Sequence, residues 1–145
     1  MILFSSELEF TFENITKMNK LIIDVANEKI FLMIITNVDI YNITHENTKI
    51  NYEKLTIIIN DFLLSKNIEI TDISAIYINQ GSGSFVGIRN SISVVKAFNV
   101  AKNIDYYCYN LDDFKDEKDL RHENIPNLCK KYKIKKNLIN PVYLS

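Results

Sequence analysis

Residues 75–89 read AIYINQGSGSFVGIR, and they join a predicted strand to a predicted helix. Residues 75–79 are mostly β-branched and aromatic, which is typical of a buried strand. Over residues 85–102 apolar side chains recur on most sides of a helical wheel, which predicts a helix buried on most sides. All three glycines of the chain fall in this junction: Gly81, Gly83 and Gly87. The junction therefore predicts a loop at the carboxyl end of a sheet strand, where α/β folds bind ligands.

The segments around this junction predict more strands and a second helix. Apolar stretches at residues 21–25, 30–36 and 38–44 are separated by short polar connections and predict an antiparallel meander. Residues 50–66 have helical spacing, and residues 105–110 predict a last strand. The order β-β-β-α-β-α-β predicts an α/β fold: a mixed sheet with antiparallel edge hairpins, parallel strands and two packed helices.

The two ends of the chain have less regular patterns. Residues 1–17 alternate apolar and polar side chains, which indicates either an extra edge strand or a loosely ordered extension. Residues 111–120 predict a charged surface helix, and residues 125–145 a basic tail. We expect the extension, then an α/β domain over residues 18–114, then a short C-terminal part over residues 115–145.

The composition is that of one globular domain. The chain has 145 residues, of which 47% are hydrophobic and 24% charged, and its net charge is -1. These values argue against disorder and against a basic nucleic-acid arm. Cys108 and Cys129 have no metal-binding spacing and are too few for a disulfide framework, and we expect Cys108 in the core. Without a membrane-length apolar run or a recognisable signal segment, we expect a soluble cytoplasmic protein with no membrane partner.

The glycine junction has two interpretations. Glycines allow close backbone approach to a ligand, and a helix N-terminus, capped here by a serine, suits a phosphate oxygen. The same residues also permit a tight turn and a helix packed closely on the sheet. The spacing matches neither a P-loop nor a dinucleotide-binding fingerprint. The candidate residues of this phosphate-binding or structural loop are Gly81, Ser82, Gly83, Ser84, Gly87 and Arg89, together with the acid Asp24.

The predicted helices carry apolar side chains on more than one face. Residues 50–66 have an apolar stripe and, on the opposite face, Ile57 and Leu64. Exposed apolar surface of this kind marks an interface with another protein chain. The candidate interface residues are Leu55, Ile57, Leu64, Ile88, Val94 and Phe98.

Other groups of polar residues give weaker signals. His45 and His122 lie far apart in the sequence, without a metal motif, and we interpret them as surface histidines. The acidic residues among 112–119 lack the glycine and spacing of a calcium loop, and a solvated helix face is favoured. We therefore expect no metal site and no catalytic residue.

The junction resembles the hallmark of the TsaB (YeaZ) family, in which an apolar strand is followed by G-P-G-S-F-T-G-[LVI]-R. MNKLIIDVA at residues 18–26 resembles the family's opening strand, which ends in I-D-T-S. Residues 53–73 resemble its first helix and T-D-[IL] lead-in, and PVYL at residues 141–144 resembles its C-terminal P-V-Y-L-R. The resemblance covers roughly residues 18–114 and the last few residues.

This resemblance implies an actin-like, ribonuclease-H-like domain in the machinery that makes N6-threonylcarbamoyladenosine at position 37 of tRNA. In that family TsaB is a degenerate, non-catalytic paralogue. It binds and activates the metal-bearing transferase TsaD through a helical dimer surface, in a complex joined by the ATPase TsaE, and it also forms homodimers. Family members carry a second subdomain before the terminal P-V-Y-L, so residues 115–145 are expected to be a short remnant of it.

Departures from the family pattern bear on nucleotide binding. The family's T-S pair is replaced by Val25 and Ala26, and its Pro and Thr in the glycine block by Ser82 and Val86. The first of these changes removes two hydroxyls that could face a phosphate, so we expect no cofactor and leave ATP as the weaker alternative. The competing function is a small phosphate- or nucleotide-binding enzyme that uses the loop at residues 81–84.

Lysines cluster in the C-terminal segment. They are candidates for contact with tRNA phosphates, and the alternative is a solubilising rim. These residues are Lys130, Lys131, Lys133, Lys135 and Lys136.

Overall fold

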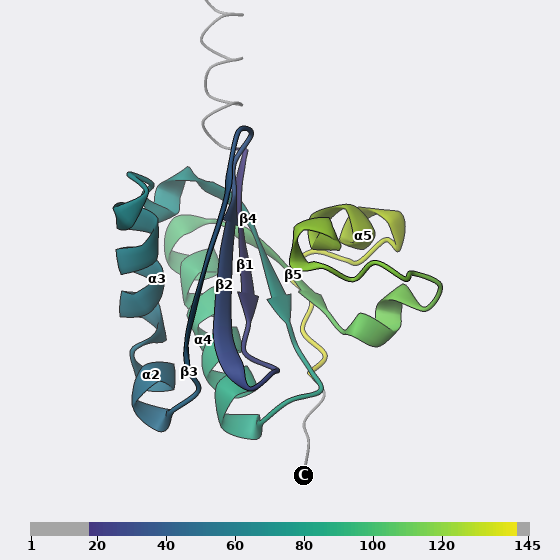
Figure 1. Ribbon diagram of the computed structural model, residues 1–145, viewed down its shortest axis with the longest axis horizontal. Helices are drawn as coiled ribbons and strands as arrows, with labels where there is room; N and C mark the ends of the chain where they lie inside the picture. The colour runs from purple at the N-terminus through teal and green to yellow at the C-terminus, as the bar shows by residue number, and fades with distance from the viewer. Residues whose placement is uncertain (1–17, 142–145) are drawn as a thin grey trace, which may run out of the picture.

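Five strands form a mixed sheet with a layer of structure on each face (Figure 1). The computed structural model describes residues 18–141. The strands are β1 (Asn19–Asp24), β2 (Lys29–Ile35), β3 (Ile40–Glu46), β4 (Ile73–Asn79) and β5 (Asp105–Tyr109). They lie in the order β3-β2-β1-β4-β5, with β1, β2 and β3 antiparallel and with β1, β4 and β5 parallel. The predicted α/β fold, with its antiparallel meander at one edge and parallel strands beside it, is confirmed.

Three helices cover one face of the sheet: α2 (Lys49–Glu53), α3 (Leu55–Ser65) and α4 (Phe85–Lys102) (Figure 1). The single helix predicted over residues 50–66 is divided at Lys54, which has φ -95° and ψ 10°. Tyr52, two residues before this break, is buried and lies against Gly87 of α4. The helix predicted over residues 85–102 begins and ends where expected.

The core under these helices is mainly apolar, and the buried Ser91 of α4 donates its hydroxyl to the Ile88 carbonyl oxygen. Alternate residues of β1, Leu21 and Ile23, are buried there, as the period of two in a strand requires. The helices contribute stripes at helical spacing. Those side chains are Leu55, Ile59, Phe62 and Leu63 of α3 and Ile88, Ile92, Val95 and Phe98 of α4.

The other face is covered by the C-terminal segment, with two 3₁₀ turns, η2 (Leu111–Phe114) and η3 (His122–Asn124), and the helix α5 (Ile125–Lys131). A further 3₁₀ turn, η1 (Ile70–Asp72), precedes β4. The charged helix predicted over residues 111–120 is wrong, because its aspartates bond locally to the backbone. Asp113 accepts from the backbone N–H of Asn110, and Asp119 from that of Arg121.

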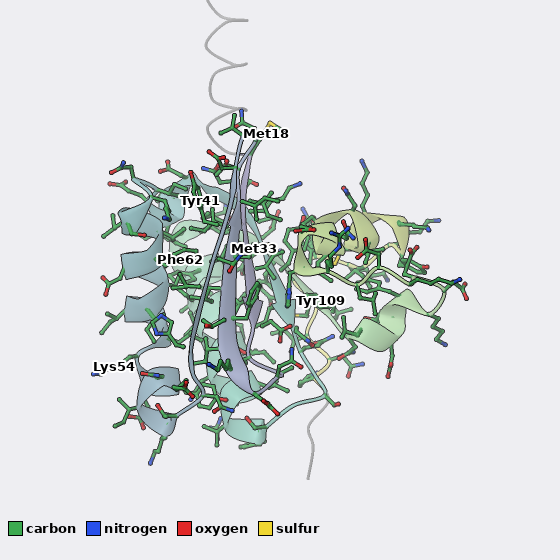
Figure 2. The ribbon with its side chains drawn as sticks, in the orientation of Figure 1. Met18, Met33, Tyr41, Lys54, Phe62 and Tyr109 are labelled. Atoms are coloured by element: carbon green, nitrogen blue, oxygen red, sulfur yellow. The ribbon has the colours of Figure 1, made fainter. Side chains whose placement is uncertain are left out.

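The prediction of a basic tail from residue 125 is also wrong for its first part. Ile125, Leu128 and Cys129 of α5 are buried with Ile22 and Tyr77 in a second core. Figure 2 labels one side chain from each core. Phe62 lies between α3 and the sheet, and Tyr109 lies on the opposite side of the sheet, beside the C-terminal segment.

Both cysteines are free and buried, so the expectation for Cys108 is confirmed. In the part of the chain described, no helix is both long and apolar enough to cross a bilayer. The strand or extension predicted for residues 1–17 lies outside the described residues, and so does most of the 141–144 motif.

Candidate functional site

The carboxyl ends of β1 and β4 bring Asp24 beside the glycine loop. Asp24 is the last residue of β1 and is only 2% exposed, and Asn79 ends the neighbouring parallel strand. The Asn79 side-chain amide donates to Asp24 Oδ1 (3.4 Å), and Asn79 Oδ1 accepts from the Gly81 backbone N–H (3.0 Å). Asp24 and the glycine loop, both candidates from the sequence, are thus linked through Asn79, which the sequence analysis did not identify.

Asp24 has further polar partners. Its carboxylate accepts from the Ala26 backbone N–H (3.0 Å) and the Asn27 side-chain amide (3.3 Å). His122 Nε2 lies 2.9 Å from Asp24 Oδ2. Together these partners compensate the cost of burying a carboxylate.

His122, interpreted from the sequence as a surface histidine, is only partly exposed and has a defined partner. Its side chain is 30% exposed, pairs with Asp24 and stacks on Phe31, with ring centroids 4.0 Å apart. Phe31 is the register partner of Asp24 in the β1–β2 ladder, so the histidine covers both residues. Asp24 and His122 are 98 positions apart in the sequence, and no motif connects them. His45 lies half-buried on β3.

Two positions of the loop require glycine, one for close packing and one for its backbone conformation. A Cβ atom at Gly83 would lie 2.7 Å from the Cα of Ala26, so the loop after β4 is pressed against the loop after β1. Gly81 has φ 143°, which favours glycine.

Gly87 lies against α2. A Cβ atom there would be 2.9 Å from the ring of Tyr52. We predicted a close approach of the helix to the sheet at this residue, and the close neighbour is instead a second helix. The predicted cap is confirmed, because Ser84 Oγ accepts from the Gly87 backbone N–H at 3.2 Å.

A polar hollow of about 370 Å³ lies between the loops that follow β1, β4 and β5. Its lining includes Asn27, Asn79, Ser82, Asp112 and Asp113. Among the described residues that line it there is no lysine or arginine, and two are aspartates. Its charge therefore disfavours a phosphate, which would need cationic or N–H partners. Arg89 is exposed and lies over the Phe85 ring, 5.6 Å from its centroid, rather than at this hollow.

The second core adds a buried hydroxyl near this carboxylate. Tyr109 is fully buried, and its hydroxyl has no hydrogen-bond partner within residues 18–141. Burial, with a contribution from the Asp24 charge, raises the pKa of Tyr109 well above 10, so the side chain is a neutral phenol. Residues 18–141 contain no cluster of three or more histidines, cysteines and carboxylates that could hold a metal ion.

The outer surface of the helices carries part of the predicted interface. Ile57 and Leu64 of α3 are 60% and 59% exposed, and Val94 of α4 is partly buried. The other three predicted interface residues are buried in the core under the helices, which corrects the prediction for them: Leu55, Ile88 and Phe98. Their helical faces point to the sheet, whereas the exposed valine Val100 was not among the predicted residues.

Comparison with solved structures identifies relatives in fold. YeaZ from Pseudomonas aeruginosa aligns with a TM-score of 0.60 and 18% identity, over 67% of this chain and 46% of that chain. A protein described as uncharacterized, with similarity to the peptidase YEAZ from Pseudomonas aeruginosa, gives the same TM-score and identity over 67% of this chain and 45% of that one. RuvC from T. thermophilus, in complex with a Holliday junction substrate, aligns with a TM-score of 0.49 and 9% identity, over 85% of this chain and 83% of that chain.

No protein-family model and no curated protein matches the sequence. The chain spans less than half the length of the two YeaZ-like structures that it matches. The structural match lies with the family that the glycine block resembles. The chain has the TsaB (YeaZ)-like α/β fold.

Proposed function

We propose that the chain is a non-catalytic, TsaB-like partner subunit in the synthesis of N6-threonylcarbamoyladenosine on tRNA. It binds a TsaD-like transferase through the outer face of α3 and α4, and it meets a TsaE-like ATPase within the same complex. A homodimer through the same face is the form it takes without that partner. The observation that carries this proposal is the apolar outer face of α3.

The apolar outer face of α3 is not needed by the core of the chain. Four other α3 side chains already fill the contact with the sheet. Ile57 and Leu64 are seven residues apart, so they lie on one line of the helix, pointing away from the sheet. On the adjacent helix Val100 is 85% exposed. Burying such side chains against a partner is favourable by roughly 25 cal/mol per Å² of apolar surface.

The polar hollow at the carboxyl ends of β1, β4 and β5 supports the non-catalytic part of the proposal. A phosphate in the hollow beside Asp24 would face Asp112 and Asp113 without a lysine or arginine among the described lining residues. Val25, at one position where the family has a hydroxyl, is buried in the apolar core. We therefore propose that the isolated chain does not bind ATP in this hollow and does not modify tRNA.

The partner surface is tested by titrating the full chain with a TsaD-like transferase from the same organism in a calorimeter. We expect Ile57→Lys and Leu64→Lys to abolish binding with the fold retained, because each introduces a charge at the centre of the apolar contact. Val38→Lys is the matched control, since Val38 is 80% exposed on the β2–β3 turn. The proposal is wrong if the wild-type chain neither binds the transferase nor self-associates in sedimentation, or if Leu64→Lys binds as the wild type does.

A further inference from the structure

A separate hollow of about 470 Å³ lies on the α5 side of the sheet. Its walls come from β1, β4, β5 and α5, through Lys20, Tyr77, Tyr107, Lys130 and Lys133. We call it the Tyr–Lys hollow. Lys20 precedes Asp24 by four residues on the same face of β1, which separates the two sites by about 13 Å along the strand. The volume is in the usual range for a small-molecule site.

A pair of stacked tyrosines, which we call the aromatic wall, lines this hollow. Tyr77 and Tyr107 are direct register partners on β4 and β5, and their rings are stacked with centroids 5.1 Å apart and planes within 12°. Tyr77 is 7% exposed and Tyr107 is half-buried, so Tyr107 offers the accessible ring. Burial raises the pKa of the Tyr77 hydroxyl further above neutral pH. A flat, neutral aromatic surface suits stacking by another planar ring.

Three lysines surround the same hollow without a carboxylate to neutralise them. Lys20, Lys130 and Lys133 form no ion pair within residues 18–141, and no acidic side chain of that part lines the hollow. Lys131 pairs with Glu117, and Lys136 lies 3.6 Å from Asp105. Of the C-terminal lysines without an ion pair in residues 18–141, Lys130 and Lys133 therefore lie at the aromatic wall and Lys135 lies outside it.

The end of α5 fixes the position of one of these lysines. Lys133 has a left-handed backbone, with φ 56°, immediately after α5. The next backbone N–H, that of Ile134, donates to the Cys129 carbonyl oxygen (2.9 Å), as in a helix-terminating turn. The helix-terminating turn thus fixes the backbone of Lys133 beside the hollow.

We propose that the Tyr–Lys hollow binds a nucleoside phosphate, with the base stacked on Tyr107 and the phosphate held by Lys20, Lys130 and Lys133. The ligand is either a free nucleotide or one unpaired nucleotide of an RNA strand. Three lysines match one or two phosphates, whereas the net charge of -1 disfavours an electrostatic grip on a long duplex. This site is independent of the helical surface and of the partner-subunit function.

The test uses the full chain with two probes, AMP and a single-stranded RNA pentamer, measured by fluorescence anisotropy or calorimetry in low salt. We expect Tyr107→Leu to weaken binding of the preferred probe by about fivefold or more, because it removes base stacking. The double variant Lys130→Gln/Lys133→Gln should also weaken it and reduce the dependence on salt. Lys135→Gln is the matched control, an exposed lysine of the same segment outside this hollow.

The two probes distinguish the source of the nucleotide. Binding of AMP with the variant effects above assigns a free nucleotide, and binding of the pentamer alone assigns a strand. Failure of both probes to bind at millimolar concentration overturns the proposal. It is overturned equally if Tyr107→Leu binds as the wild type does, or if inorganic phosphate competes as strongly as AMP. Melting curves of each variant show that loss of binding is not loss of folding.

Discussion

The two faces of the sheet are closed by different kinds of secondary structure. The face under α2, α3 and α4 is closed by aliphatic and aromatic side chains at regular helical spacing. The opposite face is closed by a short segment of 3₁₀ turns and one small helix, with Tyr77, Tyr109 and the buried carboxylate of Asp24 beneath it. The first face contributes a regular core and an outward protein surface, and the second holds both polar hollows.

The alternation of β1 explains why polar chemistry is confined to one face. Leu21 and Ile23 point to the helices, whereas Ile22 and Asp24 point to the C-terminal segment. A carboxylate at the end of this strand can therefore be reached by His122 and not by the helical layer. We therefore expect substitutions on the two faces to differ in the size of their effect on stability and in the other properties that they change.

The largest expected effect is a core truncation under the helices. Leu63→Ala should lower the free energy of unfolding by about 2–5 kcal/mol, because it leaves a cavity in a closely packed apolar layer. Leu128→Ala, in the thinner layer under α5, should cost less, since fewer neighbours surround it. Urea denaturation of both variants measures the difference. An equal or larger loss for Leu128→Ala would contradict the contrast between the faces.

The glycine loop joins β4 to α4, so it lies between the helical face and the polar hollow. Gly87→Val should lower the free energy of unfolding by about 1–3 kcal/mol, because the new side chain displaces Tyr52 of α2. It should also weaken binding of the transferase, since α4 begins there. Ser82→Ala, at an exposed position of the same loop, is the control and should change neither property. A nucleotide affinity that Ser82→Ala removes without a change in melting temperature would make the loop a phosphate site instead.

The polar cluster of the second face should have a smaller effect on stability. His122→Ala removes one partner of the buried Asp24 carboxylate, and we expect a loss of about 1–2 kcal/mol in unfolding free energy. His45→Ala is the control on β3. Combining His122→Ala with Asp24→Asn should cost less than the sum of the two single effects, because the residues interact.

The cluster around Asp24 also offers a test of whether the chain is catalytic. We expect the wild-type chain to show no ATP hydrolysis above a buffer control. Measurable turnover that Asp24→Asn abolishes would instead establish the nucleotide-binding enzyme as the function.

The helical face could be predicted from the sequence because its signals are local. Apolar spacing located α4 in full, and the meander and the Ser84 cap follow from short-range patterns. The interface prediction was less accurate, because Phe98 and Val100 both lie on an apolar helix and only the packed structure separates the buried one from the exposed one. The pairing of His122 with Asp24 depends on the path of the C-terminal segment, which no local pattern determines.

The smallest effect concerns an ion pair on the second face and depends on pH. A hydrogen bond from Lys131, and then one from Tyr132, lowers the pKa of Glu117 from its ordinary 4.5. A lowered carboxyl pKa in the folded state stabilises the protein above the ordinary pKa, and this contribution is lost as the pH falls through the folded value. Glu117→Gln should therefore lower the melting temperature slightly at pH 7, and the difference from the wild type should vanish in acid. Glu53→Gln, the same change at an exposed position of α2 without an ion pair in residues 18–141, is the matched control. An equal difference for Glu117→Gln at pH 7 and at pH 3 would show that the ion pair does not help to hold the C-terminal segment.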